Sequence, residues 1–596
     1  MATYKLDLLR KAMKEQNVSA IIVPMADPHF GEYTQEHYKC IKWLSGFDGS
    51  AGTIVVTMKD AALWTDSRYF LQATIQLANS GIELQRLKMP GTESIEVWLK
   101  GRLQARERVG VVKDLFSFSE FSSLKSELVP LDLIEIEDIF QNIWKSRPAV
   151  EFYSIDQLDD IYAGESISSK HSRVVEEIRE EGDFIYILST CDDIAWLFNI
   201  RGKDIKYNPV SFSYAAITRE QLYLFVKNGT VCEELYKKLT NEGVSIREYD
   251  DFEQFLLNYS ANAVRIAPPD KISLRKYTIS LLSGATFKSD TLRGGIVANL
   301  KAVKNPTEIN GFRKAMILDG VAWVKYLRYI EKRLQDVDNP LGEWEAAGMI
   351  GRFRAESDLY VGESFAPIVA FGHNAALPHY EPSEEIQSII AKDNFLLTDT
   401  GGQYICGTTD TTRTIAIGEI TEEQKRDYTL VLAGMIDLAM AKFPTGTRGA
   451  QLDILARGKV FSVGKMYLHG TGHGVGHYLC VHEGPQSIRM EDNLVTFKPG
   501  MVTSDEPAIY EEGRYGIRSE NLLLCREWCR NNAGTFLEFE TLTLVPFDTR
   551  PILRNLLGEE RVNWLNEYHQ RVFRELSPYL KNEDREWLKT KTANID

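Results

Sequence analysis

The length, composition and charge of the chain exclude several classes of protein. With 596 residues, of which 44% are hydrophobic and 26% charged, the chain has room for about three globular domains of roughly 100 to 200 residues each. Its formal net charge of -15 argues against broad binding to nucleic acid or anionic membrane, because both require clustered Lys and Arg.

The cysteines and the first residues indicate the compartment. Seven scattered cysteines are odd in number and suit a reducing environment better than a disulfide framework. The opening sequence MATYKLDLLRKAMKEQ predicts an amphipathic charged helix without the apolar region of a signal peptide. No run of about eighteen apolar residues follows it. We therefore expect a cytoplasmic protein.

Two stretches within the first 300 residues look like distant copies of one unit. Each begins with a predicted helix and a buried strand, and each then carries the pattern I-x-W-L, at 41–44 and 194–197. Polar and glycine-containing residues, an apolar strand and a strand rich in aromatic residues follow in both. We infer two related α/β domains, at 1–155 and 156–300.

The pattern changes after Pro306, where a third domain, at 301–596, is predicted to begin. Apolar residues recur there at the three-and-four spacing of an amphipathic helix, and they are Ile309, Phe312, Met316, Trp323, Leu327 and Ile330. From this helix to about residue 550, a helix followed by a hairpin occurs twice, and each hairpin carries two carboxylates. The chemistry is therefore expected in this domain.

The two predicted hairpins place their acids in similar positions. The first delivers Asp399 from an apolar strand and Asp410 from the strand that returns after a Gly-Gly turn. The second carries Glu506 and Glu520 on either side of EEGRYG. Facing positions on antiparallel strands lie about 5 Å apart, so two such acids can share an ion. Because unpaired charges beside apolar strands are costly to bury, metal binding is favoured over solvated turn residues.

Charge balance among these four carboxylates favours two divalent ions over one. An oxygen-rich ligand set without thiolates suits Mn(II), and Co(II) or Zn(II) could replace it. A pair of such ions lowers the pKa of a bridging water and polarises a carbonyl oxygen. We therefore expect hydrolysis by a metal-bridging hydroxide.

The segment LHGTGHGVGHYLCVHEGP, at 468–485, contains four of the ten histidines of the chain: His469, His473, His477 and His482. Its glycines argue against a helix, since each interior glycine costs about 1 kcal/mol relative to alanine. A glycine-rich strand or loop is expected instead. One imidazole is expected to join the carboxylates, and the others to carry protons or donate to an oxyanion. His379, in ALPHYEP, is a further candidate.

Together these residues resemble the metallopeptidase family of methionine aminopeptidase, prolidase and aminopeptidase P, whose catalytic domain has the pita-bread fold. The matching motifs are LTDTGGQY, GTTDTTRT, HGTGHGVG, TSDEPAIY and GIRSEN. The resemblance implies five metal ligands, which are Asp399, Asp410, His473, Glu506 and Glu520. In that family pattern Asp410 and Glu520 bridge both ions, Asp399 completes one site, and His473 with Glu506 completes the other.

The resemblance also implies three catalytic histidines. His379 would lie near the scissile amide and help to move protons, His482 would stabilise the oxyanion, and His469 would position the substrate. His373, His477 and Cys480 match no functional position of the family, and we assign them no role.

Two domains before the catalytic one, together with SGFDGSAGT, WTDSRYF and DIAWLFNIRG, are similar to the long, cytosolic type of aminopeptidase P. That type removes the first residue from peptides whose second residue is proline, a bond that is a tertiary amide without N–H, and its relatives commonly form homodimers. Prolidase, which cleaves Xaa-Pro dipeptides, is an alternative. A noncatalytic pita-bread binding module is another, as is creatinase-like chemistry without metal, although the complete set of acids disfavours the last two.

Overall fold

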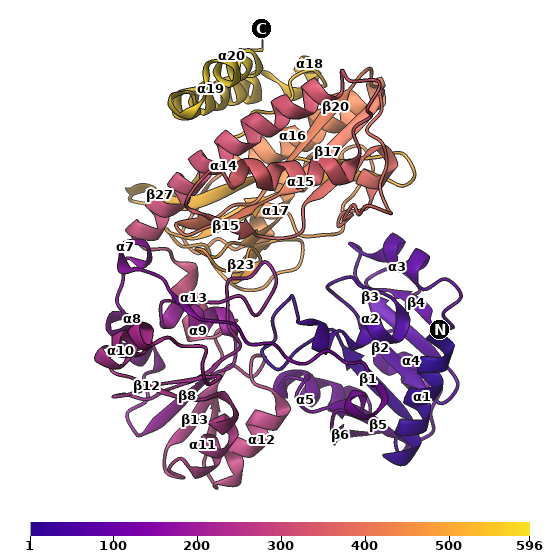
Figure 1. Cartoon of the computed structure of the whole chain (residues 1–596), viewed down its shortest axis with the longest axis vertical. Helices are drawn as coiled ribbons and strands as arrows, with labels where there is room; N and C mark the ends of the chain where they lie inside the picture. Colours follow the sequence, from indigo (N-terminus) through magenta and orange to yellow (C-terminus); the bar gives the residue numbers. More distant parts are fainter. Residues whose placement is uncertain (1, 596) are drawn as a thin grey trace. The chain divides into compact units, whose positions relative to one another are not determined.

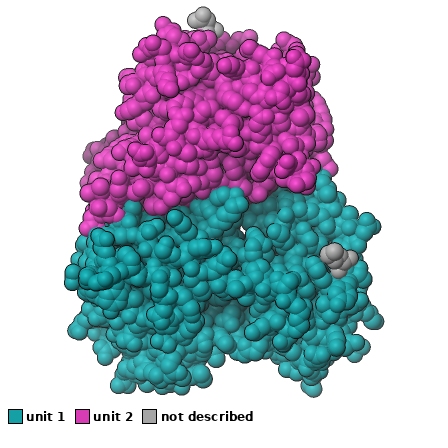
Figure 2. All heavy atoms as spheres, viewed as in Figure 1, with its two compact units in different colours: residues 1–158, 165–298 teal, residues 159–164, 299–596 magenta. Residues whose placement is uncertain are grey.

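The computed structural model describes residues 2–595, which divide into two compact units (Figure 2). The first unit comprises residues 1–158 and 165–298, and the second comprises 159–164 and 299–596. In Figure 1 the first unit runs from indigo to magenta, and most of the second runs from pink through orange to yellow.

Two six-stranded mixed sheets form the first unit. One has the strand order β4-β3-β2-β1-β5-β6, with β1 at Ala20–Pro24, β2 at Thr53–Thr57, β3 at Ala61–Thr65, β4 at Glu83–Arg86, β5 at Arg108–Val112 and β6 at Asp132–Ile136. The other has the order β12-β11-β10-β8-β13-β14, with β8 at Phe184–Leu188, β10 at Tyr214–Ile217, β11 at Leu222–Val226, β12 at Val244–Glu248, β13 at Val264–Ala267 and β14 at Phe287–Ser289.

The two sheets have the same topology. β1 pairs antiparallel with β2 and parallel with β5, and β8 pairs antiparallel with β10 and parallel with β13. The I-x-W-L motifs lie on equivalent helices, α2 (Cys40–Ser45) after β1 and α9 (Cys191–Leu197) after β8. The prediction of two related α/β domains is therefore confirmed.

Helices cover both faces of the first sheet because its central strand is apolar throughout. Alternate residues of a strand point to opposite faces: Ile21 and Val23 belong to one core cluster, and Ala20 and Ile22 to another. The helices of the unit, besides α2 and α9, are α1 (Ala2–Glu15), α3 (Phe70–Gln76), α4 (Ile95–Lys100), α5 (Phe118–Glu127), α6 (Phe140–Ile143), α8 (Ile167–Ile178), α10 (Glu233–Asn241), α11 (Phe252–Asn258) and α12 (Leu274–Leu282).

The second unit is organised around the predicted amphipathic helix, α14 (Pro306–Arg333). Its start is fixed by a capping box, in which the Asn305 side chain accepts from backbone N–H groups and Glu308 reaches back to the Asn305 N–H. Pro306 at the first helical position loses no hydrogen bond there. The apolar face, including Phe312 and Trp323, is buried as the spacing predicts.

A helix pair followed by antiparallel strands occurs twice in this unit. α14 packs against α15 (Glu343–Arg354), and β17 (Asn394–Thr400) pairs with β20 (Thr411–Ile417). α16 (Glu422–Ala439) packs against α17 (Gly449–Phe461), and β24 (Val502–Asp505) pairs with β27 (Asn521–Asn531). The remaining strands are β15 (Tyr360–Glu363), β16 (Ile368–Phe371), β18 (Gly402–Tyr404), β19 (Gly407–Thr408), β21 (Lys442–Pro444), β22 (Gly472–Gly474), β23 (Glu483–Ile488), β25 (Ala508–Glu511), β26 (Tyr515–Arg518) and β28 (Gly534–Thr541).

The second predicted hairpin proves to be two nested ones. β25 and β26 form the inner hairpin around EEGRYG, while β24 and β27 pair outside it. Pro507 lies directly after Glu506, and a proline cannot donate to a continuing ladder. Glu506 and Glu520 therefore lie at the two junctions between the outer and inner strands.

Three helices close the chain, namely α18 (Arg554–Leu557), α19 (Glu559–Leu576) and α20 (Asn582–Lys591). α19 and α20 pack against α14, and α19 also packs against α16. Leu565 and Val572 of α19 share one core cluster with Val431 and Ile436 of α16. Among the described residues, no helix combines the length and the apolar character that crossing a membrane would require.

Candidate metal centre

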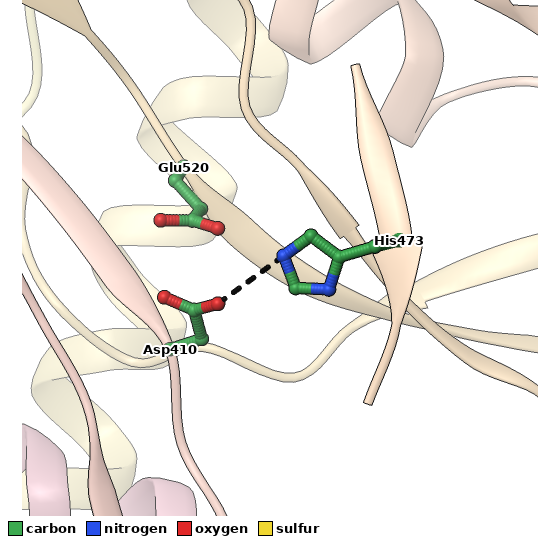
Figure 3. A group of neighbouring side chains, drawn as sticks. All are labelled: Asp410, His473 and Glu520. Atoms are coloured by element: carbon green, nitrogen blue, oxygen red, sulfur yellow. Dashed lines mark ion pairs between the residues drawn. The ribbon is translucent and has the colours of Figure 1, made fainter. Parts of the chain in front are cut away.

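Three of the predicted ligands come together in the second unit. Ligand atoms of Asp410, His473 and Glu520 lie within 4.8 Å of one another. In Figure 3 the two carboxylates face each other and the imidazole points toward both. His473 Nε2 lies 3.5 Å from Asp410 Oδ2 and 3.6 Å from Glu506 Oε1, so Glu506 borders the same space.

Strand register brings the acids of distant segments together. Asp399 pairs with Thr412 across β17 and β20. The Thr412 hydroxyl donates to Glu520 Oε2 at 2.8 Å, and the Glu520 N–H donates to Thr412 O at 3.2 Å. β20 therefore connects the acids of both hairpins, with Asp410 directly before it.

The acids are buried and repel one another. Asp399, Asp410 and Glu520 are only 8%, 3% and 2% exposed. Burial, followed by repulsion from Asp399 and Glu506, holds the pKa of Asp410 well above its ordinary value. Burial and the neighbouring Asp410 and Asp399 do the same to the pKa of Glu520. Burial, with repulsion from Asp399, raises the pKa of Glu506 to about 7, although Arg518 opposes the rise.

This donor set fits a hard or borderline divalent cation. Asp399 Oδ1 is buried without a hydrogen-bond partner, and a bare carboxylate oxygen of this kind is costly unless a cation approaches it. The His473 Nδ1 lies 2.9 Å from Gly474 O, and a carbonyl can only accept, so Nδ1 carries the proton. In the neutral imidazole Nε2 therefore turns its lone pair toward the acids, as metal-binding histidines do.

Arg518 is a component of the site that sequence reasoning missed. Its Nη2 lies 2.5 Å from Asp399 Oδ2, and the side chain is buried. One guanidinium among four carboxylates leaves a formal charge of about −3, so one or two divalent ions come equally close to neutrality. The charge argument for two ions is thus weaker than expected. The signal was present in GIRSEN, where Arg518 lies two residues before Glu520 on the inner hairpin.

His469 and His482 border the same acids. The His482 ring lies edge-on to His473, with ring centroids 4.4 Å apart, and its charge lowers the pKa values of Asp410 and Glu506. His469 Nδ1 lies 3.7 Å from Glu506 Oε2. The His469 Nδ1 donates to Gly470 O, so Nε2 accepts from Tyr510 Oη at 2.9 Å.

Tyr510 connects His469 to Arg518. Arg518 Nη1 donates to Tyr510 Oη at 2.6 Å, which extends the chain of contacts from His469 through Tyr510 and Arg518 to Asp399. His379 is half-buried in the loop before β17, and the carbonyl of the neighbouring Pro378 accepts from Arg518 Nη2 at 3.4 Å. The loop of His379 therefore also reaches this network.

The three residues to which we assign no role differ in burial. His477 is buried with its ring edge-on to Phe312 of α14, at 5.7 Å between centroids. A Cβ on Gly311 would lie 2.8 Å from His477 Nε2. The His477 ring therefore packs directly against the backbone of α14 at Gly311. His373 is exposed in the 3-10 helix at Gly372–Ala376, and Cys480 is half-buried.

Comparison with known proteins agrees with this architecture. The model of metallopeptidase family M24 matches residues 310–527, and its C-terminal region matches 535–595. Two models of the creatinase/prolidase N-terminal domain match residues 5–144 and 146–308. The fold is thus two related α/β domains followed by a pita-bread domain.

Full-length relatives narrow the assignment. "Probable Xaa-Pro aminopeptidase P" of Coprinopsis cinerea is 38% identical over 99% of this chain and 98% of its own. The protein of the same name from Laccaria bicolor is 37% identical over 100% and 94%. "X-prolyl aminopeptidase from Caenorhabditis elegans: a cytosolic enzyme with a di-nuclear active site" has a crystal structure that covers 100% of both chains, with a TM-score of 0.94 and 33% identity. This chain therefore belongs to metallopeptidase family M24 and, within it, to the three-domain aminopeptidase P group.

Proposed function

We propose that the protein is a metal-dependent Xaa-Pro aminopeptidase, which removes the first residue from peptides with proline in second position. One observation carries the proposal: four carboxylates and one imidazole gather in a buried centre of a chain that matches Xaa-Pro aminopeptidase P over its whole length. A noncatalytic module would have no use for mutually repelling buried acids, whose burial is costly.

We propose that two divalent ions, Mn(II) by preference and Co(II) or Zn(II) as replacements, are held by Asp399, Asp410, His473, Glu506 and Glu520. The oxygen-rich donor set supports the choice of metal, and the di-nuclear site of the Caenorhabditis elegans relative supports the second ion. When bound, the ions supply a more acidic water and a polarised carbonyl. Following the family pattern, Asp410 and Glu520 would be shared between them.

The histidines supply what the substrate needs during cleavage. We assign to His482, beside Asp410 and Glu506, the donation of a hydrogen bond to the oxygen that becomes negative as water adds to the carbonyl carbon. The proline nitrogen must gain a proton as the C–N bond breaks, and we assign this to His379. His469, held by Tyr510 and Gly470, positions the substrate.

The activity test varies both peptide length and metal. Protein loaded with Mn(II) is expected to release the first residue from an Xaa-Pro-Pro peptide, to leave an Xaa-Ala-Pro peptide largely intact, and to lose activity with a chelator. Release from Xaa-Pro dipeptides alone would instead identify a prolidase. No release with Mn(II), Co(II) or Zn(II) would favour a noncatalytic binding module.

We also propose that the protein is a homodimer. Apolar side chains of α17 and of the loops that follow α17 and β23 are exposed, namely Ile454, Leu455, Phe461, Met466, Leu468, Met490 and Leu494. Exposed apolar side chains that lie this close together along the chain support an interface in this region. Sedimentation should show a dimer that dissociates in Phe461→Glu but not in the control Leu282→Glu, an exposed leucine of α12. A monomeric wild type would contradict the proposal.

Two further proposals concern compartment and domain limits. The Caenorhabditis elegans relative is described as cytosolic, and we propose a cytoplasmic location for this protein. Recovery of the protein with membranes in cell fractionation would contradict it.

We propose domain limits at 1–155, 156–300 and 301–596. Limited proteolysis that cuts first within one of these segments, rather than near its ends, would overturn them.

A further inference from the structure

Three buried charges lie together beside the candidate centre, outside the proposed ligands. Lys304 Nζ lies 2.5 Å from Glu483 Oε1, and Lys301 Nζ lies 3.6 Å from Glu483 Oε2. The three side chains, which we term the lysine-glutamate cluster, are at most 2% exposed. Buried ion pairs contribute little net stability, because desolvation offsets their attraction, and their best-attested use is to fix one arrangement of the chain.

Glu483 connects the segments that carry two of the site histidines. His482 directly precedes Glu483 in the sequence. The Cα partner of Glu483 across β22 and β23 is Gly474, which directly follows His473. The His473 and His482 rings meet edge-on with centroids 4.4 Å apart. A shift of Glu483 therefore changes the position of the His482 backbone relative to His473.

The loop between the histidines is packed directly on Glu483. A Cβ on Gly476 would lie 2.8 Å from Glu483 Oε2, and one on Gly474 would lie 2.3 Å from Glu483 O. Only glycine allows the backbone to come this close at both positions. The Glu483 carboxylate is therefore packed closely against the backbone of Gly476.

Lys304 is itself fixed to the segment that leads to Glu506. The Lys304 N–H donates to Gly500 O at 3.0 Å, and Val303 forms a bridge with Met501. Met501 directly precedes β24, and Glu506 directly follows that strand. The cluster thus links the segment of His482 to the acid strand through charges that solvent does not screen.

We propose that Glu483, held by Lys304 and Lys301, is a positioning residue that sets the place of the His482 imidazole. The proposal rests on the proposed function, in which His482 donates to the developing oxyanion. This positioning role differs from a role in stability, because Glu483 would affect catalysis only through the position of His482.

The test is a double-mutant cycle of Glu483→Gln with His482→Ala. Glu483→Gln keeps the shape and removes the charge, and it is expected to lower kcat roughly 10- to 100-fold, less than the 10²- to 10³-fold typical of a lost oxyanion donor. KM and Mn(II) content should change less than about twofold. In the His482→Ala background the same substitution should cause no further loss of kcat. Multiplicative losses, or loss of metal, would overturn the proposal.

A second variant keeps the test usable if Glu483→Gln does not fold. Lys301→Met removes the longer of the two contacts, and a several-fold loss of kcat, absent in the His482→Ala background, is expected. Asp584→Asn, which removes a carboxylate from its ion pair with Arg328 far along the chain in α20, is the control and should leave kcat unchanged.

A structural readout separates this proposal from the proposed function. If the wild type cleaves no Xaa-Pro peptide with any divalent ion, the proposed function fails. A crystal structure of Glu483→Gln, or of Lys301→Met, still decides the positioning role, because the His482 ring should leave its edge-on contact with His473. A ring that stays in place would overturn the proposal whatever the activity.

Discussion

Asp410→Asn is expected to abolish metal binding and peptidase activity together while leaving the metal-free fold intact. The substitution keeps the side-chain volume and removes one negative charge from a carboxylate that, in our proposal, both ions would share. We expect kcat/KM to fall at least about 1,000-fold, because the reaction depends on the acidified water that the ions supply. Mn(II) content, measured on protein dialysed against limiting metal, should fall with it.

The stability of the metal-free variant distinguishes this outcome from misfolding. In the metal-free wild type, Asp410 is buried and repelled by Asp399 and Glu506, so an amide there relieves repulsion. The melting temperature of metal-free Asp410→Asn should equal or exceed that of the wild type. The wild type should gain about 2.7 kcal/mol at a metal concentration 100 times Kd, and the variant should gain almost nothing.

A matched acid-to-amide change supplies the control for Asp410→Asn. Asp437 on α16 is partly buried and makes an ion pair with Arg561 at 2.6 Å. Asp437→Asn should keep both metal and turnover, at a cost of at most about 1 kcal/mol for a partly exposed pair. Full turnover in Asp410→Asn would show that the ligand set is wrong.

Local sequence patterns predicted the elements of the site well. The positions of Asp399 and Asp410 followed from an apolar strand, a glycine turn and a returning strand, and β17 and β20 pair accordingly. The glycine spacing around His473 excluded a helix, and the segment contains the short strand β22. Such features depend on neighbouring residues only, so they can be inferred from the chain itself.

Long-range pairings could not be inferred in the same way. Arg518 reaches Asp399 across 119 positions, and no periodicity of either strand indicates the partner of the other. The lysine-glutamate cluster joins residues 179 positions apart. For this reason the charge balance predicted for the four acids did not include Arg518. The ion pairs of Glu483 could not be predicted either, although Glu483 lies beside His482 in the sequence.

The acids of the centre should make metal affinity strongly dependent on pH. In the metal-free protein Glu506 has a pKa raised to about 7, and the pKa values of Asp410 and Glu520 are higher than their ordinary values as well. An ion must displace the protons that these groups hold. Between pH 7 and pH 5, the proton on Glu506 alone should weaken the apparent affinity for Mn(II) about tenfold per pH unit, and protons on Asp410 and Glu520 steepen the loss.

The sign of the effect on stability follows from the same shifts. Folding raises the pKa of such a carboxyl, so the group contributes its full stability to the metal-free protein at pH values below its unfolded pKa of about 4.5. This contribution is lost as the pH rises through the pKa of the folded protein. For Glu506 the loss by pH 7 is on the order of 3 kcal/mol. Buried His29 and His569, whose pKa values are lowered to about 3, act in the opposite direction and destabilise the fold as the pH falls below about 6.5.

His29 and His569 contribute equally to the stability of the metal-loaded and the metal-free protein. Their contribution therefore cancels in the difference between the two melting temperatures. The rise in melting temperature on adding Mn(II) should therefore be large at pH 8 and shrink steadily toward pH 5, in parallel with the measured Mn(II) affinity. Glu506→Gln should remove one proton from the slope between pH 5 and pH 7 while weakening binding at every pH. A metal-induced shift of the same size from pH 5 to pH 8 would mean that the acids are ionised before metal arrives, and that a fixed positive charge beyond Arg518 already balances them.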